Sequence, residues 1–352
     1  MSAKPRTSAA GSAPTSADVA RLAGVSRATV SFVLNGSAAG RVGEGTRQKV
    51  LEAARQLGYV PNAAARSLRA GRSGLVLIDN PDIVWGPLFS GFIADLRRNL
   101  QALGYTALLY GGAEAGRDPE SAARGWAELR PTAVVFGLGM APAPGAVDLL
   151  KRSGTQAVIA WGGEREPGAH WLRPHLTDVG AVAAEHLLER GRRRIGVIVP
   201  TDPTLNYFSA PRLAGVQEAV ARFARDRELT NAEAASVVRI DLDYTEQAAA
   251  GLAARLPELD VDAIFAYNDE YAMLVAAGLQ DAGVRIPEDV ALVGADDLML
   301  SRLLRPRLTS VRTELPSGHE LAALIDRLVH TVDEPPVTVE MGEALIIPRE
   351  SS

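Results

Sequence analysis

The sequence predicts an α/β fold in which a small helical unit precedes a larger core of parallel sheets. From residue 75 onward, short apolar runs alternate with helical segments, which is typical of buried parallel strands covered by helices. Before residue 75, apolar residues recur at helical spacing and are interrupted by glycine and asparagine. A chain of 352 residues is also longer than one ordinary domain, so we expect two or three units.

The composition narrows the class of protein. There is no cysteine, which excludes a disulfide scaffold, a thiolate metal site and a cysteine nucleophile, and no apolar run is long enough to cross a membrane.

Residues 1–74 carry 11 Lys and Arg against 3 Asp and Glu, whereas the remainder carries 26 against 39. This asymmetry fits a nucleic-acid-binding arm on an acidic body, and it fits chance surface charge equally well. We expect a cytoplasmic protein that associates with the nucleoid.

Two short helices near the N-terminus follow a predicted disordered tail at residues 1–14, which is rich in Ser, Ala and Pro. We place Ser16 as the N-cap of a helix at 17–23, Gly24 in the turn, and Ser26 as the N-cap of a helix at 27–34. Two helices joined by such a turn form a helix-turn-helix, whose second helix fits the major groove of DNA; a plain helical hairpin is the alternative. The residues that this second helix would expose are Arg27, Ala28, Ser31 and Phe32, with Thr29 close to the backbone.

Two further helices are predicted before the core. The first runs over 46–57, with Thr46 either as its N-cap or in contact with a phosphate, and Gly58 ends it. Pro61 prevents continuation, and Asn62 can cap a short helix at 63–69. A helix of this length is not stable alone in water, so we expect it to order only when something holds it.

The run D-V-A-R-L-A-G-V-S-R-A-T-V-S-F-V-L-N, followed by T-R-Q-K-V-L-E-A-A-R-Q-L-G-Y-V-P-N-A-A-A-R-S-L-R, resembles the headpiece and hinge of the lactose-repressor (LacI/GalR) family of bacterial transcription regulators. The resemblance implies a three-helix helix-turn-helix headpiece at 15–60 and a hinge helix and linker at 61–73. Leu68 from two subunits would wedge into the minor groove of the operator. The DNA-binding residues that it implies are Ser26, Arg27, Ala28, Thr29, Ser31, Phe32, Asn35, Thr46, Asn62, Ala63, Ala65, Leu68 and Arg69.

Phe32 departs from the family pattern, because an arginine that pairs with guanine is common at this position. A phenylalanine ring can touch a thymine methyl group but cannot form a bidentate bond with guanine. We therefore expect a different operator base there, unless the ring packs on the headpiece core instead.

The remaining 74–352 reads as a core with two subdomains, because about 280 residues exceed what one sheet needs. The strands are expected at 75–78, 107–110, 133–137, 157–160, 194–199, 237–240, 263–267 and 290–293. Helical stretches are expected between them, for example at 88–103, 179–190 and 212–225. In such sheets, ligands bind at the carboxyl ends of the strands.

Polar and aromatic residues stand at these strand ends and helix starts. Asn268 and Asp296 follow two predicted strands, and Arg212 is expected to open a helix within S-A-P-R-L-A-G. Carboxylate, amide and guanidinium groups beside aromatic faces suit a polyhydroxylated ligand, although each carboxylate could equally cap a helix or form a surface pair. The candidate effector-binding residues are Phe89, Trp161, Arg212, Tyr244, Asn268 and Asp296.

The segments A-I-F-A-Y-N-D-E, R-I-P-E-D-V-A-L-V-G-A-D-D and R-P-R-L-T-S-V resemble core motifs of the same family. The resemblance implies a periplasmic-binding-protein-like, two-lobed core of interleaved subdomains that binds effector and dimerises. His175 and Leu176 stand roughly where the family commonly has an Asp-Asn pair, which puts the identity of the effector in doubt; His175 itself is expected to be structural.

No phosphate loop, zinc-binding helix motif, nucleophile elbow or dinucleotide fingerprint is visible, so we expect no enzyme and no cofactor or metal. The sequence predicts a sequence-specific, DNA-binding repressor. It would act as a homodimer on near-palindromic double-stranded operator DNA, and a small-molecule effector of carbohydrate type would modulate it. A regulator that senses a non-sugar such as a nucleoside, or no effector, is the alternative, and a transporter-type carbohydrate-binding protein or a Rossmann-type enzyme is less favoured.

Overall fold

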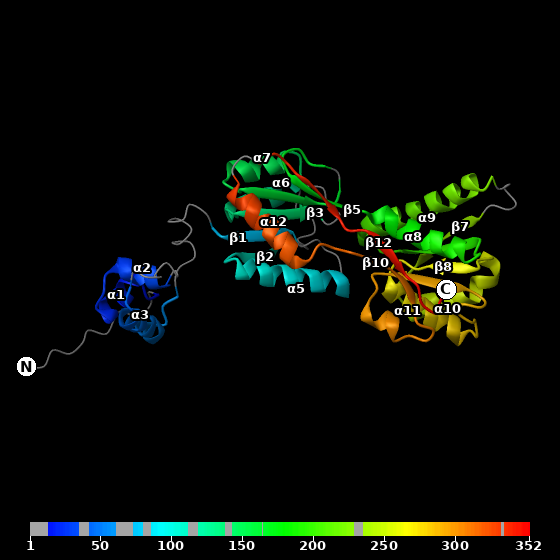
Figure 1. Cartoon of the computed structure of the whole chain (residues 1–352), viewed down its shortest axis with the longest axis horizontal. Coiled ribbons are helices and arrows are strands. Elements are labelled where there is room, and N and C mark those ends of the chain that lie inside the picture. The colour runs from blue at the N-terminus through cyan, green and yellow to red at the C-terminus, as the bar shows by residue number, and fades with distance from the viewer. Residues whose placement is uncertain are drawn as a thin grey trace, which may run out of the picture. The chain divides into compact units, whose positions relative to one another are not determined.

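The computed structural model describes residues 13–34, 42–60, 73–79, 86–111, 119–137, 143–163, 165–228, 235–331 and 334–352. The chain divides into two compact units, residues 1–73 and 74–352, each with its own core. The first unit is helical and the second contains both sheets (Figure 1).

The first unit packs three helices, α1 (Ser16–Ala23), α2 (Arg27–Leu34) and α3 (Glu44–Leu57), around a small apolar core. Gly24 and Gly58 end α1 and α3 with φ of 65° and 62°, a region in which a side chain is strained and glycine is not. The buried core residues come from all three helices and are Val19, Ala20, Val30, Val33, Val50, Ala53 and Ala54.

The helix starts differ in part from the sequence predictions. Ser26 caps α2 as predicted, because its Oγ accepts from the backbone N–H of Thr29 at 3.0 Å. Ser16 is wrong as the cap of α1: it is the first helical residue, and Thr15 precedes it. The backbone N–H and the hydroxyl of Thr15 both donate to the carboxylate of Asp18, at 2.9 and 2.6 Å, and these bonds fix the helix start one residue earlier. Thr46 lies inside the first turn of α3, which begins two residues before it.

The second unit consists of two lobes (Figure 1). Lobe 1 contains a parallel sheet of order β11-β5-β4-β3-β1-β2. Its strands are β1 (Leu75–Asp79), β2 (Thr106–Tyr110), β3 (Ala133–Gly137), β4 (Ala157–Trp161), β5 (His170–Pro174) and β11 (Thr338–Met341). Helices α5 (Pro87–Ala102) and α12 (Gly318–His330) cover one face, and α6 (Pro119–Glu128) and α7 (Ala146–Arg152) cover the other.

Lobe 2 repeats this plan with a sheet of order β12-β10-β9-β8-β6-β7, in which only β12 is antiparallel to its neighbour. Its strands are β6 (Arg194–Pro200), β7 (Ser236–Leu242), β8 (Ala263–Phe265), β9 (Ala291–Ala295), β10 (Thr309–Thr313) and β12 (Ala344–Ile347). Helices α8 (Leu176–Glu189) and α9 (Asn206–Asp226) pack on one face, and α10 (Glu246–Leu259) and α11 (Asp269–Asp281) on the other.

Within the described residues, the chain passes between the lobes three times: from β5 to α8, from β10 to α12, and from β11 to β12 (Figure 1). The two lobes are therefore built from interleaved segments. In both sheets, parallel strands point their carboxyl ends toward the other lobe. The loops that follow these strands can therefore contribute to one site between the lobes.

Two corrections follow for the predicted elements. The helix expected to open at Arg212 begins six residues earlier, at Asn206, and carries Pro211 inside it, so Arg212 lies well within the helix. The strand expected to reach residue 267 ends at Phe265, because Asn268 is already the N-cap of α11. Four strands were not predicted at all: β5, β10, β11 and β12.

Candidate functional site

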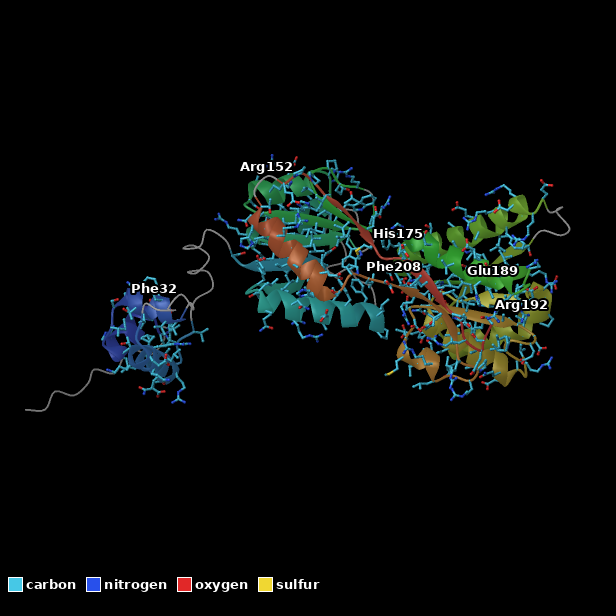
Figure 2. All side chains as sticks on the ribbon, in the orientation of Figure 1. Phe32, Arg152, His175, Glu189, Arg192 and Phe208 are labelled. Atoms are coloured by element: carbon cyan, nitrogen blue, oxygen red, sulfur yellow. The ribbon has the colours of Figure 1, made fainter. Side chains whose placement is uncertain are left out.

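A cavity of about 590 Å³ lies between the two lobes. Lobe 1 contributes Phe89 from α5 and Trp161 from the end of β4, whereas lobe 2 contributes Arg212 and the loops that follow its strands. Figure 2 labels His175 and Phe208 in the region where the lobes meet, and both line the cavity. All six candidate effector-binding residues lie in its wall: Phe89, Trp161, Arg212, Tyr244, Asn268 and Asp296.

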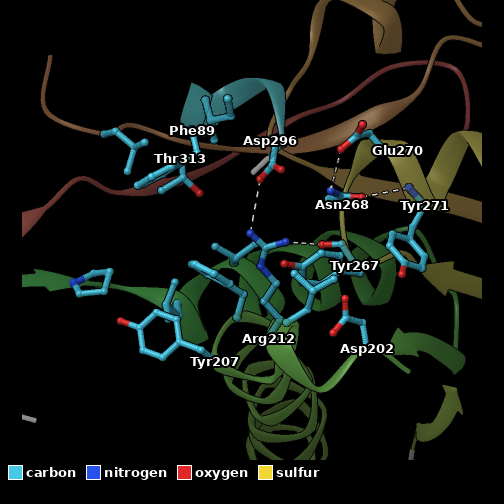
Figure 3. A pocket seen from close by; sticks show the side chains of 18 of the residues that line it. Phe89, Asp202, Tyr207, Arg212, Tyr267, Asn268, Glu270, Tyr271, Asp296 and Thr313 are labelled. Atoms are coloured by element: carbon cyan, nitrogen blue, oxygen red, sulfur yellow. Dashed lines mark hydrogen bonds and ion pairs between the residues drawn. The ribbon is translucent and has the colours of Figure 1, made fainter. Parts of the chain in front are cut away.

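Arg212 stands in the middle of the polar part of this wall (Figure 3). Its guanidinium donates to the carbonyl oxygen of Tyr267, lies 3.4 Å from Oδ1 of Asp296, and covers the Tyr267 ring at 4.9 Å from the centroid. The side chain is only 9% exposed. Among the described residues its Nε has no hydrogen-bond partner, so the charge is held by two groups and is still not fully satisfied.

The position of Arg212 depends on a close crossing of α8 and α9. Gly180 on α8 lies against the backbone of Arg212, and Gly215 on α9 lies against the backbone of Thr177 and Ala181. A side chain at either glycine would collide with the opposite helix. The two glycines therefore let the helices approach closely enough to place the guanidinium at the ends of β8 and β9.

Asp296 and Asn268 are fixed by the local backbone. Asp296 follows β9 with φ of 93°, a strained conformation for a residue with a side chain, and this turns its carboxylate toward Arg212. Burial raises the pKa of Asp296, and the neighbouring guanidinium opposes that rise. Asn268 caps α11 by accepting from the N–H of Tyr271 at 3.0 Å, and its amide donates to Glu270 at 3.4 Å. Asn268 thus combines helix capping with a place in the cavity wall.

Aromatic rings form another part of the cavity wall. On lobe 1, Trp161 packs edge-on against Phe89, with ring centroids 5.6 Å apart. On lobe 2, Tyr271 contacts Tyr244 and Tyr267, with centroids 4.9 and 5.5 Å apart. Tyr244 is 57% exposed, so its ring is open to an incoming ligand. Burial raises the pKa values of Tyr267 and Tyr271 to about 12, so both hydroxyls stay protonated and can donate.

Sequence reasoning missed several residues of this wall. Asp202 and Asp243 follow β6 and β7, so the strand-end rule that selected Asn268 and Asp296 would also have selected them. Glu270 is the second residue of α11 and carried no such signal. Tyr207 on α9 accepts from the backbone N–H of Gly163, at 3.2 Å, and so connects a lobe 1 loop with a lobe 2 helix.

His175, which we expected to be structural, lies at the crossover from β5 to α8 and lines the cavity. Its ring nitrogens approach Oε2 of Glu340 at 3.1 Å and Oδ2 of Asp178 at 3.4 Å. Arg173 also contacts Glu340, at 2.6 Å. His175 therefore contacts acidic residues at the crossover between the lobes and also lines the cavity.

The carboxylates beside the two site residues face inward instead. Asp269 accepts from Ser301 at 2.5 Å, Ser310 at 2.6 Å and the Leu298 N–H at 2.7 Å, and burial raises its pKa to about 6. Asp297 is 2% exposed and is bonded by three guanidinium groups, those of Arg302, Arg312 and Arg349. Both hold the loops of lobe 2 together, and neither lines the cavity.

In the helical unit, the second helix presents a mixed surface. Arg27 and Ala28 are exposed, and Phe32 is 39% exposed, so its ring is not enclosed in the headpiece core (Figure 2). Thr29, Ser31 and Thr46 are half-buried, and Ser26 is exposed at the start of α2. The remaining predicted DNA contacts lie outside the described residues; these are Asn35, Asn62, Ala63, Ala65, Leu68 and Arg69.

The geometry defines a class of protein: a helix-turn-helix unit in one chain with a two-lobed core that encloses a ligand-sized cavity. Residues 15–62 match the family model for bacterial regulatory proteins of the lacI family, and residues 184–352 match that for a periplasmic binding protein-like domain. Among the described residues, no helix is both long and apolar enough to cross a membrane.

Two relatives are similar over most of their length. The chain is 33% identical over 336 residues to the HTH-type transcriptional regulator CelR of Thermobifida fusca, covering 92% of this chain and 94% of CelR. It is 32% identical over 303 residues to GalR of Escherichia coli strain K12, covering 84% and 83%. The chain therefore belongs to the lacI family, and it is a DNA-binding transcriptional regulator whose activity an effector modulates. Its relatives are regulators and not enzymes.

Solved structures show the same fold. A complex of the transcriptional regulator CelR with cellobiose matches with a TM-score of 0.61 and 28% identity, over 96% of this chain and all of the other. The lac repressor dimer bound to operator and the anti-inducer ONPF matches with a TM-score of 0.73 over 97% and 99% of the two chains; at 20% identity this likeness concerns the fold alone.

Proposed function

We propose that this regulator is a repressor that binds near-palindromic operator DNA as a homodimer, and that a carbohydrate effector in the interlobe cavity controls its grip on DNA. The observation that carries the proposal is the cluster of Arg212, Asp296 and Asn268 facing Phe89 and Trp161 across one cavity. Fixed donors and acceptors beside ring faces are what a polyhydroxylated molecule needs. We place the protein at the nucleoid in the cytoplasm, where operator DNA is found.

In this proposal the headpiece, residues 15–60, reads DNA with α2. Arg27, Ala28 and Phe32 are the side chains that α2 exposes toward base edges, and the hydroxyl of Ser26 lies at the positive end of the helix dipole, where a phosphate is favoured. The hinge and linker, residues 61–73, would add contacts from Asn62, Ala63, Ala65, Leu68 and Arg69. Asn35 and Thr46 would contact the DNA backbone.

The core, residues 74–352, would both dimerise and transmit the signal. Within the described residues, the two lobes are covalently connected through three crossovers, about which they can rotate relative to each other. A ligand that contacts both lobes would therefore change their relative orientation. Contacts such as that from Gly163 to Tyr207 would break or form as the lobes move. The separation of two hinge segments in a dimer would change with the lobes, and a coupling of about 1–3 kcal/mol changes operator affinity by 5- to 150-fold.

The test uses the full-length protein and genomic fragments. Fragments retained by the protein are sequenced, and binding to a shared motif is then measured by fluorescence anisotropy against random duplex competitor. We expect a near-palindromic motif and an affinity that falls steeply with salt, because Lys and Arg release counterions from phosphates. Leu68→Ala should weaken specific binding far more than non-specific binding. No preference over random duplex, or equal losses for Leu68→Ala, would reject the corresponding part of the proposal.

A further inference from the structure

The charges around the cavity are unevenly distributed. Four carboxylates line it, those of Asp202, Asp243, Glu270 and Asp296, and Arg212 is the one guanidinium among the described lining residues. The charge of Arg212 is already engaged by Asp296 and by the carbonyl of Tyr267. Among the side-chain nitrogens of Arg212, only Nε lacks a hydrogen-bond partner within the described residues. An anionic ligand would therefore meet four carboxylates and one cation whose charge is already shared with Asp296.

The N-terminal end of α5, one of the helix starts at the cavity, already faces a carboxylate. Gly86 is the N-cap of α5, and a Cβ placed on it would lie 3.3 Å from Oε2 of Glu270. The carboxylate of Glu270 on lobe 2 thus faces the N-terminal end of a lobe 1 helix, where the helix dipole favours negative charge. A ligand phosphate or carboxylate would have to compete with Glu270 for this end.

The two lobes offer different chemistry to a ligand. The lining residues of lobe 1 are almost entirely apolar: Gly86, Leu88, Phe89, Trp161, Pro174 and Met341. The carboxylates, the guanidinium and the three tyrosines that contact one another all belong to lobe 2. A ligand that matches both surfaces has hydroxyl groups along one edge, to donate to carboxylates, and an apolar face for Phe89 and Trp161.

We infer that the cavity selects an uncharged saccharide of about two rings and discriminates against phosphorylated forms of the same sugar. The inference deepens the proposed function and rests on its assignment of the cavity to the effector. The cavity of about 590 Å³ lies within the range of about 300–1,000 Å³ that small-molecule pockets span. Discrimination comes from electrostatic repulsion, because carboxylates accept hydrogen bonds from sugar hydroxyl groups but repel the negatively charged oxygens of a phosphate.

The experiment measures binding of matched sugar pairs to the full-length protein by isothermal titration calorimetry. The pairs are cellobiose, maltose, lactose and trehalose, each with its 6-phosphate counterpart. We expect at least one neutral disaccharide to bind, and its phosphate to bind at least about tenfold more weakly, because each nearby carboxylate disfavours it. A phosphate that binds as tightly as its neutral partner would overturn the inference, as would the failure of all four neutral sugars to bind.

Glu270→Gln tests the cause of the selectivity. It removes one negative charge and keeps the shape, so the ratio between neutral and phosphorylated sugar should shrink. Glu218→Gln is the matched control, because Glu218 lies on α9 with Arg212 but is exposed and outside the cavity wall. An unchanged ratio in Glu270→Gln would overturn the charge explanation.

Binding to the operator is measured separately, without sugar. If DNA binding fails while the sugar ratios behave as expected, the proposed function fails and the ligand inference stands. If operator binding is normal and a phosphorylated sugar binds best, the inference fails and the proposed function stands.

Discussion

Substituting Gly180 by alanine should disturb both the stability of lobe 2 and its response to effector. A Cβ at Gly180 would lie 2.8 Å from the carbonyl carbon of Arg212 and 3.1 Å from its Cα, and it would overlap the carbonyl oxygen. These atoms belong to the backbone of α9, so no side-chain rotation relieves the collision and the two helices must separate. Overpacking of this kind costs about 1–3 kcal/mol.

The assay is thermal unfolding of the full-length protein followed by circular dichroism, together with sugar titrations. A loss of 1 kcal/mol lowers the midpoint of a large domain by about 2–4 °C, so a cost of about 1–3 kcal/mol should lower it by roughly 2–12 °C. Because α9 carries Arg212, its displacement also moves the guanidinium away from Asp296 and weakens effector binding. Operator binding by the separate helical unit should persist.

Gly251→Ala is the control, because Gly251 is an exposed glycine inside α10 with no atom near the added methyl group. Alanine is the better helix former, so this variant should gain up to about 1 kcal/mol. If Gly180→Ala unfolds at the same temperature as Gly251→Ala and responds normally to effector, the close crossing of α8 and α9 does not position Arg212.

Three further predictions concern single residues. Arg212→Ala should abolish the effector response in anisotropy assays while operator binding without effector persists; a normal response would remove Arg212 from the site. Phe32→Ala should lower operator affinity but cost the headpiece less than about 1 kcal/mol in denaturant unfolding, because the ring is 39% exposed, whereas a loss of about 3–5 kcal/mol would place it in the core. Asp269 has its pKa raised from 3.8 to about 6 by burial, so the folded core binds this proton more tightly than the unfolded chain does. Its contribution to stability is then present below pH 3.8 and lost as the pH rises through about 6, and Asp269→Asn should remove that part of the pH dependence of unfolding; an unchanged pH profile would contradict it.

Local sequence patterns predicted the helical unit and most of the strands well. Ser26 caps α2 and Gly24 ends α1 as predicted, because caps and turns are properties of neighbouring residues. The apolar strands of both sheets were found for the same reason. Three of the missed strands, β5, β10 and β11, mix polar with apolar residues, whereas β12 is a short apolar run near the end of the chain. Their pairing with distant strands is what makes them strands.

The sequence by itself determined the three helices of the first unit, eight of the strands of the core, the strand ends at which polar residues cluster, and the likeness to one family of regulators. Only the tertiary structure shows why Asp296, and not the adjacent Asp297, lines the cavity. Asp296 points to Arg212 because of its unusual backbone, whereas Asp297 is enclosed by three arginines from other segments. The tertiary structure also brings Glu270 close to Gly86 at the start of α5, although the two residues are far apart in the chain. Such contacts depend on how lobes and helices pack, and that packing is set by the whole core and not by the residues nearby.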